Sequence, residues 1–169
     1  GRGNQPGEGG VAFATQLSAH TGSPMATGYG LTTHWVNRQT GQVPPDACKL
    51  CTVGDYLAMR MTGGAEPRMH ATNAASFGLF NLQTGAFDPA ALRAADIAPQ
   101  WLPPVQAGAG LAGTTPAGLA VALAIGDNQA GFFGCGGAEG AVAVNVGTSG
   151  QVSMLTDGRA AAPGLDLRP

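Results

Sequence analysis

The spacing of apolar residues predicts helices in three parts of the chain, at about residues 11–20, 50–62 and 89–95. In the second, Leu50, Val53, Leu57 and Met61 recur at steps of three and four residues, as on one face of a helix. Gly63-Gly64 would end this helix. The same spacing places Asp55 on the polar side, so we expect its carboxylate to be solvated or to pair loosely with Arg60.

Other segments have the pattern of strands or loops. The predicted extended segments are residues 76–82, 101–105, 117–125, 141–146 and 150–155. The run 117–125 is apolar throughout, which is typical of a strand buried on both faces. A helix is expected to follow it from Asp127 to Gly134. We expect residues 27–35 to form a loop that lines a site, and residues 106–115 to be a glycine-rich connector.

Composition narrows the class of protein. With 169 residues, of which 44% are hydrophobic and 11% charged, the chain can form one folded domain and is not typical of a disordered protein. A net charge of −2 and scattered basic residues give no footprint for nucleic acid or an anionic membrane. No apolar run approaches the roughly 20 residues needed to span a bilayer. Three cysteines favour a reducing compartment, and we expect a cytoplasmic protein.

The ends of the chain suggest an excerpt. It begins Gly1-Arg2-Gly3-Asn4 without an initiator methionine and stops just after an expected hairpin. We therefore expect it to belong to a longer polypeptide. The glycine-rich residues 1–10 are expected to be flexible, because they contain no large apolar residue that could offset the entropy of ordering.

Asp127 is the first candidate for chemistry. It follows Gly126 at the expected junction of a strand and a helix. The simpler interpretation is an N-cap, whose carboxylate accepts hydrogen bonds from free backbone N–H groups. The functional interpretation is a general base at the carboxyl end of a strand, where ligand sites of open α/β sheets gather.

The second candidate is the Gly147-Thr148-Ser149-Gly150 turn. It could be an ordinary hairpin turn, or its small residues, hydroxyls and backbone N–H groups could hold phosphates. No lysine follows, so it is not a Walker loop. Cys48 and Cys51 have the spacing of half a zinc site without a second pair, and two reduced thiols are the alternative. Residues 108–113 fit a dinucleotide pattern but lack its strand and helix.

Together the motifs resemble the FGGY family of carbohydrate kinases. Five motifs occur in the expected order, at residues 51–63, 70–80, 102–105, 124–130 and 145–151. The resemblance covers about residues 11–156. The Thr27-Gly28-Tyr29-Gly30 and Asn73-Ala74-Ala75-Ser76 runs are similar to the sedoheptulokinase-like branch.

This resemblance implies an α/β fold of the actin-like, ribonuclease-H-like type, with two lobes and a cleft for ATP, Mg²⁺ and a sugar or ketose. By motif position, Asp127 would be the general base and Asn128 a sugar contact. Gly147, Thr148 and Ser149 would contact the phosphate side of ATP. Residues 11–137 would form the latter part of the N-terminal lobe, and residues 138–169 the opening hairpin of the C-terminal lobe.

Several family motifs are missing from the chain. It has no Asp-x-Gly-Thr phosphate hairpin, no Gln-Met-His-Gly-like sugar motif and no glycine-rich adenosine site. The resemblance implies that the complete protein phosphorylates a sugar. Because these motifs are missing, we expect this chain alone to be inactive. The alternative is a non-catalytic, sugar-binding or degenerate member of the fold. The sequence leaves the choice of sugar and the formation of a homo-oligomer open.

Overall fold

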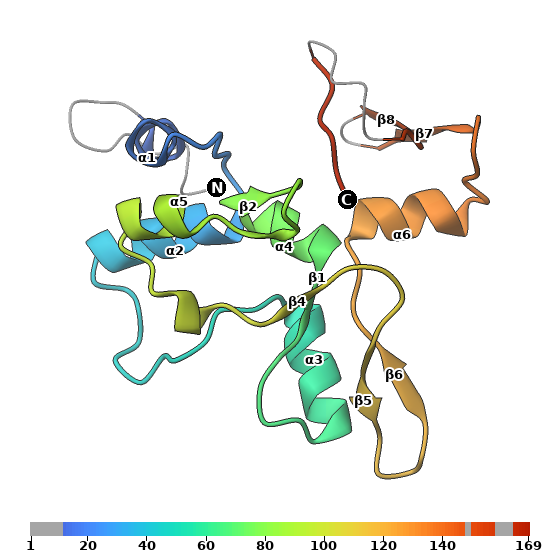
Figure 1. Cartoon of the computed structure of the whole chain (residues 1–169), viewed down its shortest axis with the longest axis horizontal. Coiled ribbons are helices and arrows are strands. Elements are labelled where there is room, and N and C mark those ends of the chain that lie inside the picture. Colours follow the sequence, from blue (N-terminus) through green and yellow to red (C-terminus); the bar gives the residue numbers. More distant parts are fainter. Residues whose placement is uncertain (1–11, 148–149, 158–163) are drawn as a thin grey trace.

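The computed structural model describes residues 12–147, 150–157 and 164–169. Figure 1 shows a cluster of helices, with α3 and a small β-hairpin extending from it and a second β-hairpin lying over the last helix. The predicted flexible segment at residues 1–10 lies outside the described residues.

The helices and strands follow one another in short segments. The helices are α1 (Phe13–Thr21), α2 (Gly30–Gln39), α3 (Val53–Thr62), α4 (Ala71–Phe77), α5 (Pro89–Ala94) and α6 (Asp127–Gly134), with a 3₁₀ turn at Pro99–Trp101. The strands are β1 (Met69–His70), β2 (Phe80–Asn81), β3 (Ala86–Phe87), β4 (Val105–Gln106), β5 (Leu111–Thr114), β6 (Ala120–Ala122), β7 (Val142–Val146) and β8 (Gly150–Met154).

The main hydrophobic core lies in the first two thirds of the chain. Its buried members come from α1, α2, α5 and the turns that connect them, and they are Leu17, Met25, Leu31, Leu79, Ala91, Leu92, Ala95, Ile97 and Leu102. Helix α1 packs on α2 and α5, and α2 also contacts α4. Phe77 of α4 packs against this core.

Helix α3 forms where expected but turns an unexpected face inward. Thr52 and Asp55 form a capping box at its start, and Gly63 ends it in the left-handed conformation, with φ 68°. The buried residues of the helix are Asp55 and Ala58, whereas Val53 is 85% exposed and Leu57 is also exposed. A Cβ atom at Gly54 would come within 2.8 Å of Ala124. The close contact between α3 and residue 124 is therefore made by small residues. Because Asp55 is buried, the prediction that its carboxylate is solvated is wrong.

The described strands form four separate two-stranded sheets. β1 and β4 are parallel, with Met69 opposite Val105, and the other three pairs are antiparallel. The predicted buried strand at residues 117–125 is wrong, because β6 spans only Ala120–Ala122 and alternates exposed and half-buried positions. Its partner β5 lies within the predicted connector, so the two segments form a hairpin around Pro116 to Leu119.

Two further predictions need correction. Residues 30–35, expected in a loop, belong to α2. Gly30 serves packing there, since a Cβ atom would lie 2.7 Å from the Phe77 ring. Residues 76–77, expected in an extended segment, complete α4, and the strand β2 begins only at Phe80.

The segment predicted as extended at residues 101–105 is extended only after Trp101, which ends the 3₁₀ turn. The other predicted elements are confirmed. α1 ends at Thr21, just before Ser23-Pro24, and Asp88 caps α5 with Pro89 in its first turn. α6 spans the predicted Asp127–Gly134, and β7 and β8 form the predicted hairpin, with Val146 opposite Gly150. Among the described residues, every helix is too short or too polar to cross a bilayer.

Candidate functional site

Asp127 is the first residue of α6, and its side chain is exposed. The helix N-cap is Gly126, so the interpretation of Asp127 as the N-cap is not confirmed. The carboxylate Oδ1 accepts a hydrogen bond of 2.8 Å from the neighbouring N–H of Asn128. Because no other hydrogen bond of this side chain occurs among the described residues, Oδ2 can face a ligand. A negative charge is also favourable at the N-terminus of a helix.

The backbone just before Asp127 is held from behind by α4. Thr72 Oγ1 accepts a buried hydrogen bond of 2.8 Å from the N–H of Gly126. Asn73 Nδ2 donates a 2.9 Å hydrogen bond to the carbonyl oxygen of Ala124. The exposed carboxylate therefore follows a segment that two hydrogen bonds fix, at Ala124 and at the buried Gly126. Asp127 does not follow a strand of a parallel sheet, so its placement differs from the geometry expected from sequence.

A buried acid lies behind the same turn. Asp55 is 1% exposed, and its Oδ2 accepts a 3.0 Å hydrogen bond from the N–H of Thr52. Burial raises the pKa of the Asp55 carboxyl, while Thr52, Asn73 and His70 favour its charged form to a smaller extent. Within the described part of the chain, Oδ1 has no hydrogen-bond partner of good geometry. This carboxyl is inside the fold and is not available to a substrate.

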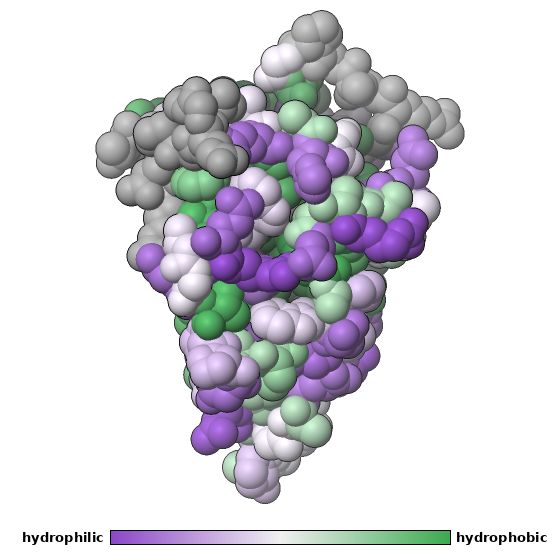
Figure 2. Space-filling view, turned by 90° about the vertical axis from the view of Figure 1, so that its left-hand side faces the viewer, coloured by the Kyte–Doolittle hydropathy of each residue, from purple (hydrophilic) through white to green (hydrophobic). Residues whose placement is uncertain are grey.

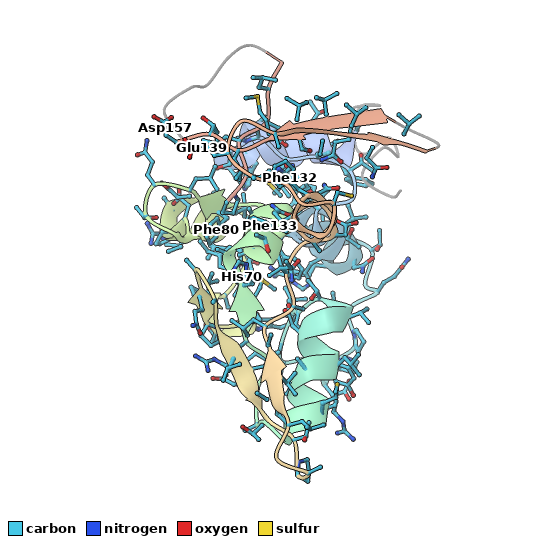
Figure 3. All side chains as sticks on the ribbon, turned by 90° about the vertical axis from the view of Figure 1, so that its right-hand side faces the viewer. His70, Phe80, Phe132, Phe133, Glu139 and Asp157 are labelled. Carbon is cyan, nitrogen blue, oxygen red and sulfur yellow. The ribbon has the colours of Figure 1, made fainter. Side chains whose placement is uncertain are left out.

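His70, which is half-buried, connects β1 to α4 and lies beside this acid. It is the N-cap of α4, and its ring accepts a hydrogen bond from the N–H of Thr72. Figure 3 shows His70 at this junction, beside the chain that leads from β6 into α6. Sequence reasoning noted residues 70–80 only as a motif. A cluster of polar residues at the start of a short apolar helix was the signal that could have singled them out.

The hairpin candidate lies apart from Asp127. Gly147 is exposed directly after β7, whereas Thr148 and Ser149 lie outside the described residues. Figures 1 and 3 show the β7–β8 hairpin on the opposite side of α6 from β5 and β6. No hydrogen bond or ion pair among the described residues joins Gly147 to the turn at Asp127. Asp127 and Asn128 are thus adjacent at the start of α6, whereas Gly147 lies apart from them.

The segment at residues 164–169 lies back near the same region. Arg168 donates a 3.1 Å hydrogen bond to the Tyr29 hydroxyl, and its guanidinium lies 5.6 Å from the centre of that ring. Gln129 of α6 donates a 3.1 Å hydrogen bond to the carbonyl oxygen of Pro169. Tyr29, from the Thr27–Gly30 run, therefore lies on the same side of the molecule as the start of α6.

A hollow of about 370 Å³ lies elsewhere, between α2 and the 3₁₀ turn. Its lining includes His34, Arg38, Arg93, Asp96 and Trp101. Burial and the charge of Arg38 lower the pKa of His34, whose ring lies 5.1 Å from that of Trp101. Figure 2, which views the molecule from the left-hand side of Figure 1, shows a band of hydrophilic residues across the middle. Arg38 is already paired with Asp96, so this hollow is not the better candidate.

Metal ligands are not gathered in the described residues. No group of three or more His, Cys, Asp or Glu side chains among them is placed to hold a metal ion. Cys48, Cys51 and Cys135 are free thiols. Burial raises the pKa of the Cys51 thiol, and the charge of Asp55 raises it to a smaller extent. Asp127 alone does not make a site for Mg²⁺, which prefers six oxygen ligands.

Comparison with known proteins identifies the family. The N-terminal domain of the FGGY family of carbohydrate kinases matches residues 12–144. The chain belongs to this family. Asp127 and its supporting turn lie inside the matched region, and so do α1 to α6.

Relatives with several substrates are similar to this FGGY chain. Sedoheptulokinase of Mus musculus is 30% identical over 137 residues, which are 76% of this chain and 29% of that protein. Glycerol kinase of Alkalilimnicola ehrlichii is 35% identical over 114 residues, covering 64% of this chain and 23% of that protein. The chain therefore spans about three tenths or less of the length of these relatives.

Solved structures confirm the fold. Gluconate kinase from Lactobacillus acidophilus aligns with a TM-score of 0.71 at 24% identity, over 86% of this chain and 32% of that one. The ligand-bound xylulose kinase from the same organism aligns with a TM-score of 0.64 at 24% identity, over 83% and 31%. The chain has part of the actin-like, ribonuclease-H-like fold of FGGY sugar kinases, as its motifs predict.

Proposed function

We propose that the complete protein containing this chain transfers the γ-phosphoryl group of ATP to a hydroxyl group of a sugar or ketose. One observation carries the assignment of the catalytic residue. It is the exposed Asp127 carboxylate, which begins α6 directly after a segment that two hydrogen bonds from α4 hold, one of them buried. Membership of a carbohydrate kinase family supports this chemistry.

Asp127 acts as the general base in this proposal. Its carboxylate accepts the proton of the substrate hydroxyl as the oxygen of that hydroxyl forms a bond to the γ-phosphorus of ATP. The bond between that phosphorus and the oxygen bridging to the β-phosphate breaks, and ADP leaves. Asn128, exposed beside Asp127, contributes an amide donor and acceptor for a neighbouring sugar hydroxyl.

The proposal assigns the phosphate side of ATP to the hairpin connection. Gly147, Thr148 and Ser149 lie between the paired residues Val146 and Gly150. A loop of small residues lets phosphate oxygens approach backbone N–H groups closely. Mg²⁺ is proposed to accompany ATP and offset the charge of its phosphates, with no ligand assigned to it in this chain.

A sedoheptulose-like ketose is the proposed substrate. The runs at residues 27–30 and 73–76 support this choice, as does the similarity to mouse sedoheptulokinase. Because a glycerol kinase is also similar to this chain, the proposed substrate has to be tested against a panel that includes glycerol. We also propose that residues 11–137 belong to the N-terminal lobe and that residues 138–169 open the C-terminal lobe.

The decisive experiment is an ATP-coupled assay of the complete gene product with a panel of ketoses, other sugars and glycerol. Asp127→Asn keeps the size of the side chain but removes the base. We expect kcat to fall by about 10² to 10⁴, because a positioned general base contributes that factor. The substrate preference of the wild-type protein identifies the sugar.

A matched control is Asp88→Asn, the same change at the start of another helix. Asp88 caps α5, and asparagine is an equally good N-cap, so turnover should be unchanged. If Asp127→Asn stays within about five-fold of wild type, Asp127 is not the general base. If the wild-type protein binds a sugar but turns over none of the panel, the non-catalytic alternative is correct.

A further inference from the structure

Residues at the start of α4 hold the turn that precedes Asp127. Thr72 is 4% exposed, and its Oγ1 lies 2.8 Å from the N atom of Gly126, which is 54 positions later in the chain. Asn73 Nδ2 in turn donates a hydrogen bond to the carbonyl oxygen of Ala124. The backbone is thus fixed through a carbonyl on one side and an N–H group on the other.

The hydrogen bonds through Thr72 run in one direction. Its hydroxyl oxygen accepts from Gly126, so the hydroxyl proton is free to be donated to His70 Nδ1, at 2.9 Å. The N–H of Thr72 lies 3.2 Å from the same nitrogen. Because Nδ1 accepts from both donors, the ring proton of neutral His70 is on Nε2, which lies 3.1 Å from the carbonyl oxygen of Gly108.

This arrangement gives each donor a suitable acceptor. Gly126 donates to Thr72, Thr72 donates to His70, and His70 donates to Gly108. Serine could supply the same hydroxyl group at position 72, whereas valine has the same shape without it. The chain of donors thus ties the start of α6 to α4 and to the loop before β5.

We propose that Thr72 is a positioning residue for catalysis, which sets the orientation of the Asp127 carboxylate by holding Gly126. The inference rests on the proposed role of Asp127 as general base. Thr72 does not touch the substrate. It acts because Gly126 immediately precedes Asp127, and a displaced Gly126 moves the carboxylate away from the reacting hydroxyl.

The test is Thr72→Val in the complete gene product. We expect kcat to fall by about 10- to 100-fold, since a misplacement of about 1 Å has effects of this size, with KM for sugar and ATP within about three-fold. Thr72→Ser should recover kcat to within about three-fold of wild type. Hydrogen exchange of a peptide covering residues 124–130 should be faster in Thr72→Val than in wild type.

The matched control is Thr62→Val. Thr62, the last residue of α3, is half-buried, and among the described residues its hydroxyl donates to the carbonyl oxygens of Ala58 and Met59 in its own helix. Its kcat and the exchange of residues 124–130 should match wild type. If Thr72→Val does not fold, Thr72→Ala takes its place, because the smaller side chain leaves room for water at the Gly126 N–H.

A second comparison separates positioning from general damage. In an Asp127→Asn background, Thr72→Val should lower the residual kcat by no more than about two-fold, because its effect passes through the missing carboxylate. An equal loss in both backgrounds overturns the proposal, and so does a folded Thr72→Val enzyme with wild-type kcat. If Asp127→Asn itself is fully active, the proposed general base fails, while faster exchange at residues 124–130 still shows that Thr72 holds the turn.

Discussion

Asp55 shows how far a single residue can depart from its local pattern. Its position opposite the apolar stripe of α3 predicted contact with solvent. Its side chain instead folds back to the N–H of Thr52 and is buried, with Asn73 of α4 and His70 beside it. A helix start needs an acceptor for its free N–H groups, and this local requirement accounts for the inward-facing acid.

The buried Asp55 carboxyl makes stability depend on pH. Its pKa is raised in the folded protein, so the folded state holds this proton more tightly than the unfolded state. The contribution to stability is full below the unfolded pKa of about 4 and is lost as pH rises through the higher folded pKa. We predict that Asp55→Asn gains free energy of unfolding relative to wild type as pH rises from about 4 to 7.

Urea unfolding of both proteins over this pH range measures the difference. Asparagine retains an acceptor for the N–H of Thr52, so the capping box is kept and the charge is removed. Asp46→Asn, at an exposed position, is the matched control. An advantage of Asp55→Asn that shrinks as pH rises would contradict the sign of the predicted effect.

The candidate base could be found from sequence, but its support could not. Asp127 stands in a short motif, and its place at the start of a helix follows from residues nearby. Its hydrogen-bonded support comes from Thr72 and Asn73, more than 50 positions away in the chain. Local pattern cannot pair residues at such a distance. The motif at residues 70–80 marked them as members of a family without indicating what they contact.

At the level of elements, prediction succeeded where local chemistry determines the structure. Asp88 and Pro89 specify the start of α5, and Gly63 specifies the end of α3. It failed at residues 117–125, where an apolar run indicates burial but not the number of strands. There Gly118, with φ 83°, forms the turn of a hairpin. The pairing partner decided the outcome, and it lay in a segment with no strand pattern of its own.

The cap of α5 offers a direct test of this local chemistry. Asp88 Oδ1 accepts hydrogen bonds from the N–H groups of Ala90 and Ala91, at 2.8 and 3.2 Å. We predict that Asp88→Ala lowers the free energy of unfolding by about 1 kcal/mol, because two helix N–H groups lose their acceptor. Chemical denaturation measures the change.

Asp88→Asn supplies the control, since it keeps the acceptor and should cost only a few tenths of a kcal/mol at most. Equal losses in the alanine and asparagine variants would show that the charge of Asp88, and not its capping hydrogen bonds, stabilises α5.

For the whole molecule, burial is uneven. The core draws on residues 17–102, whereas the hairpin β7–β8 leaves Val142, Val144, Val146 and Val152 largely exposed. Within the described residues Asp127 and Gly147 belong to two regions without a direct bond. The described residues therefore place the proposed base and Gly147 of the proposed phosphate loop in separate parts of the structure.

We predict that the 169-residue chain alone binds ATP weakly, with a Kd above the micromolar range, and has no kinase activity. The physical reason is that the chain lacks the Asp-x-Gly-Thr hairpin and the glycine-rich adenosine site, so few contacts offset the entropy of binding. Isothermal titration with MgATP measures the affinity, with the complete gene product as the control. A micromolar Kd for the chain alone would show that these residues already form the nucleotide site.

The two-stranded form of the β7–β8 hairpin has a consequence for handling the protein. Among the described residues, each strand has one edge of backbone N–H and C=O groups without a neighbouring strand. Neither strand contains a charged residue or a proline, the usual features that discourage pairing between molecules. In solution as an isolated chain, this hairpin is a template for adding a strand from another copy. Replacing one of the exposed valines, such as Val144 or Val152, with lysine is therefore a practical first change for keeping the chain monomeric.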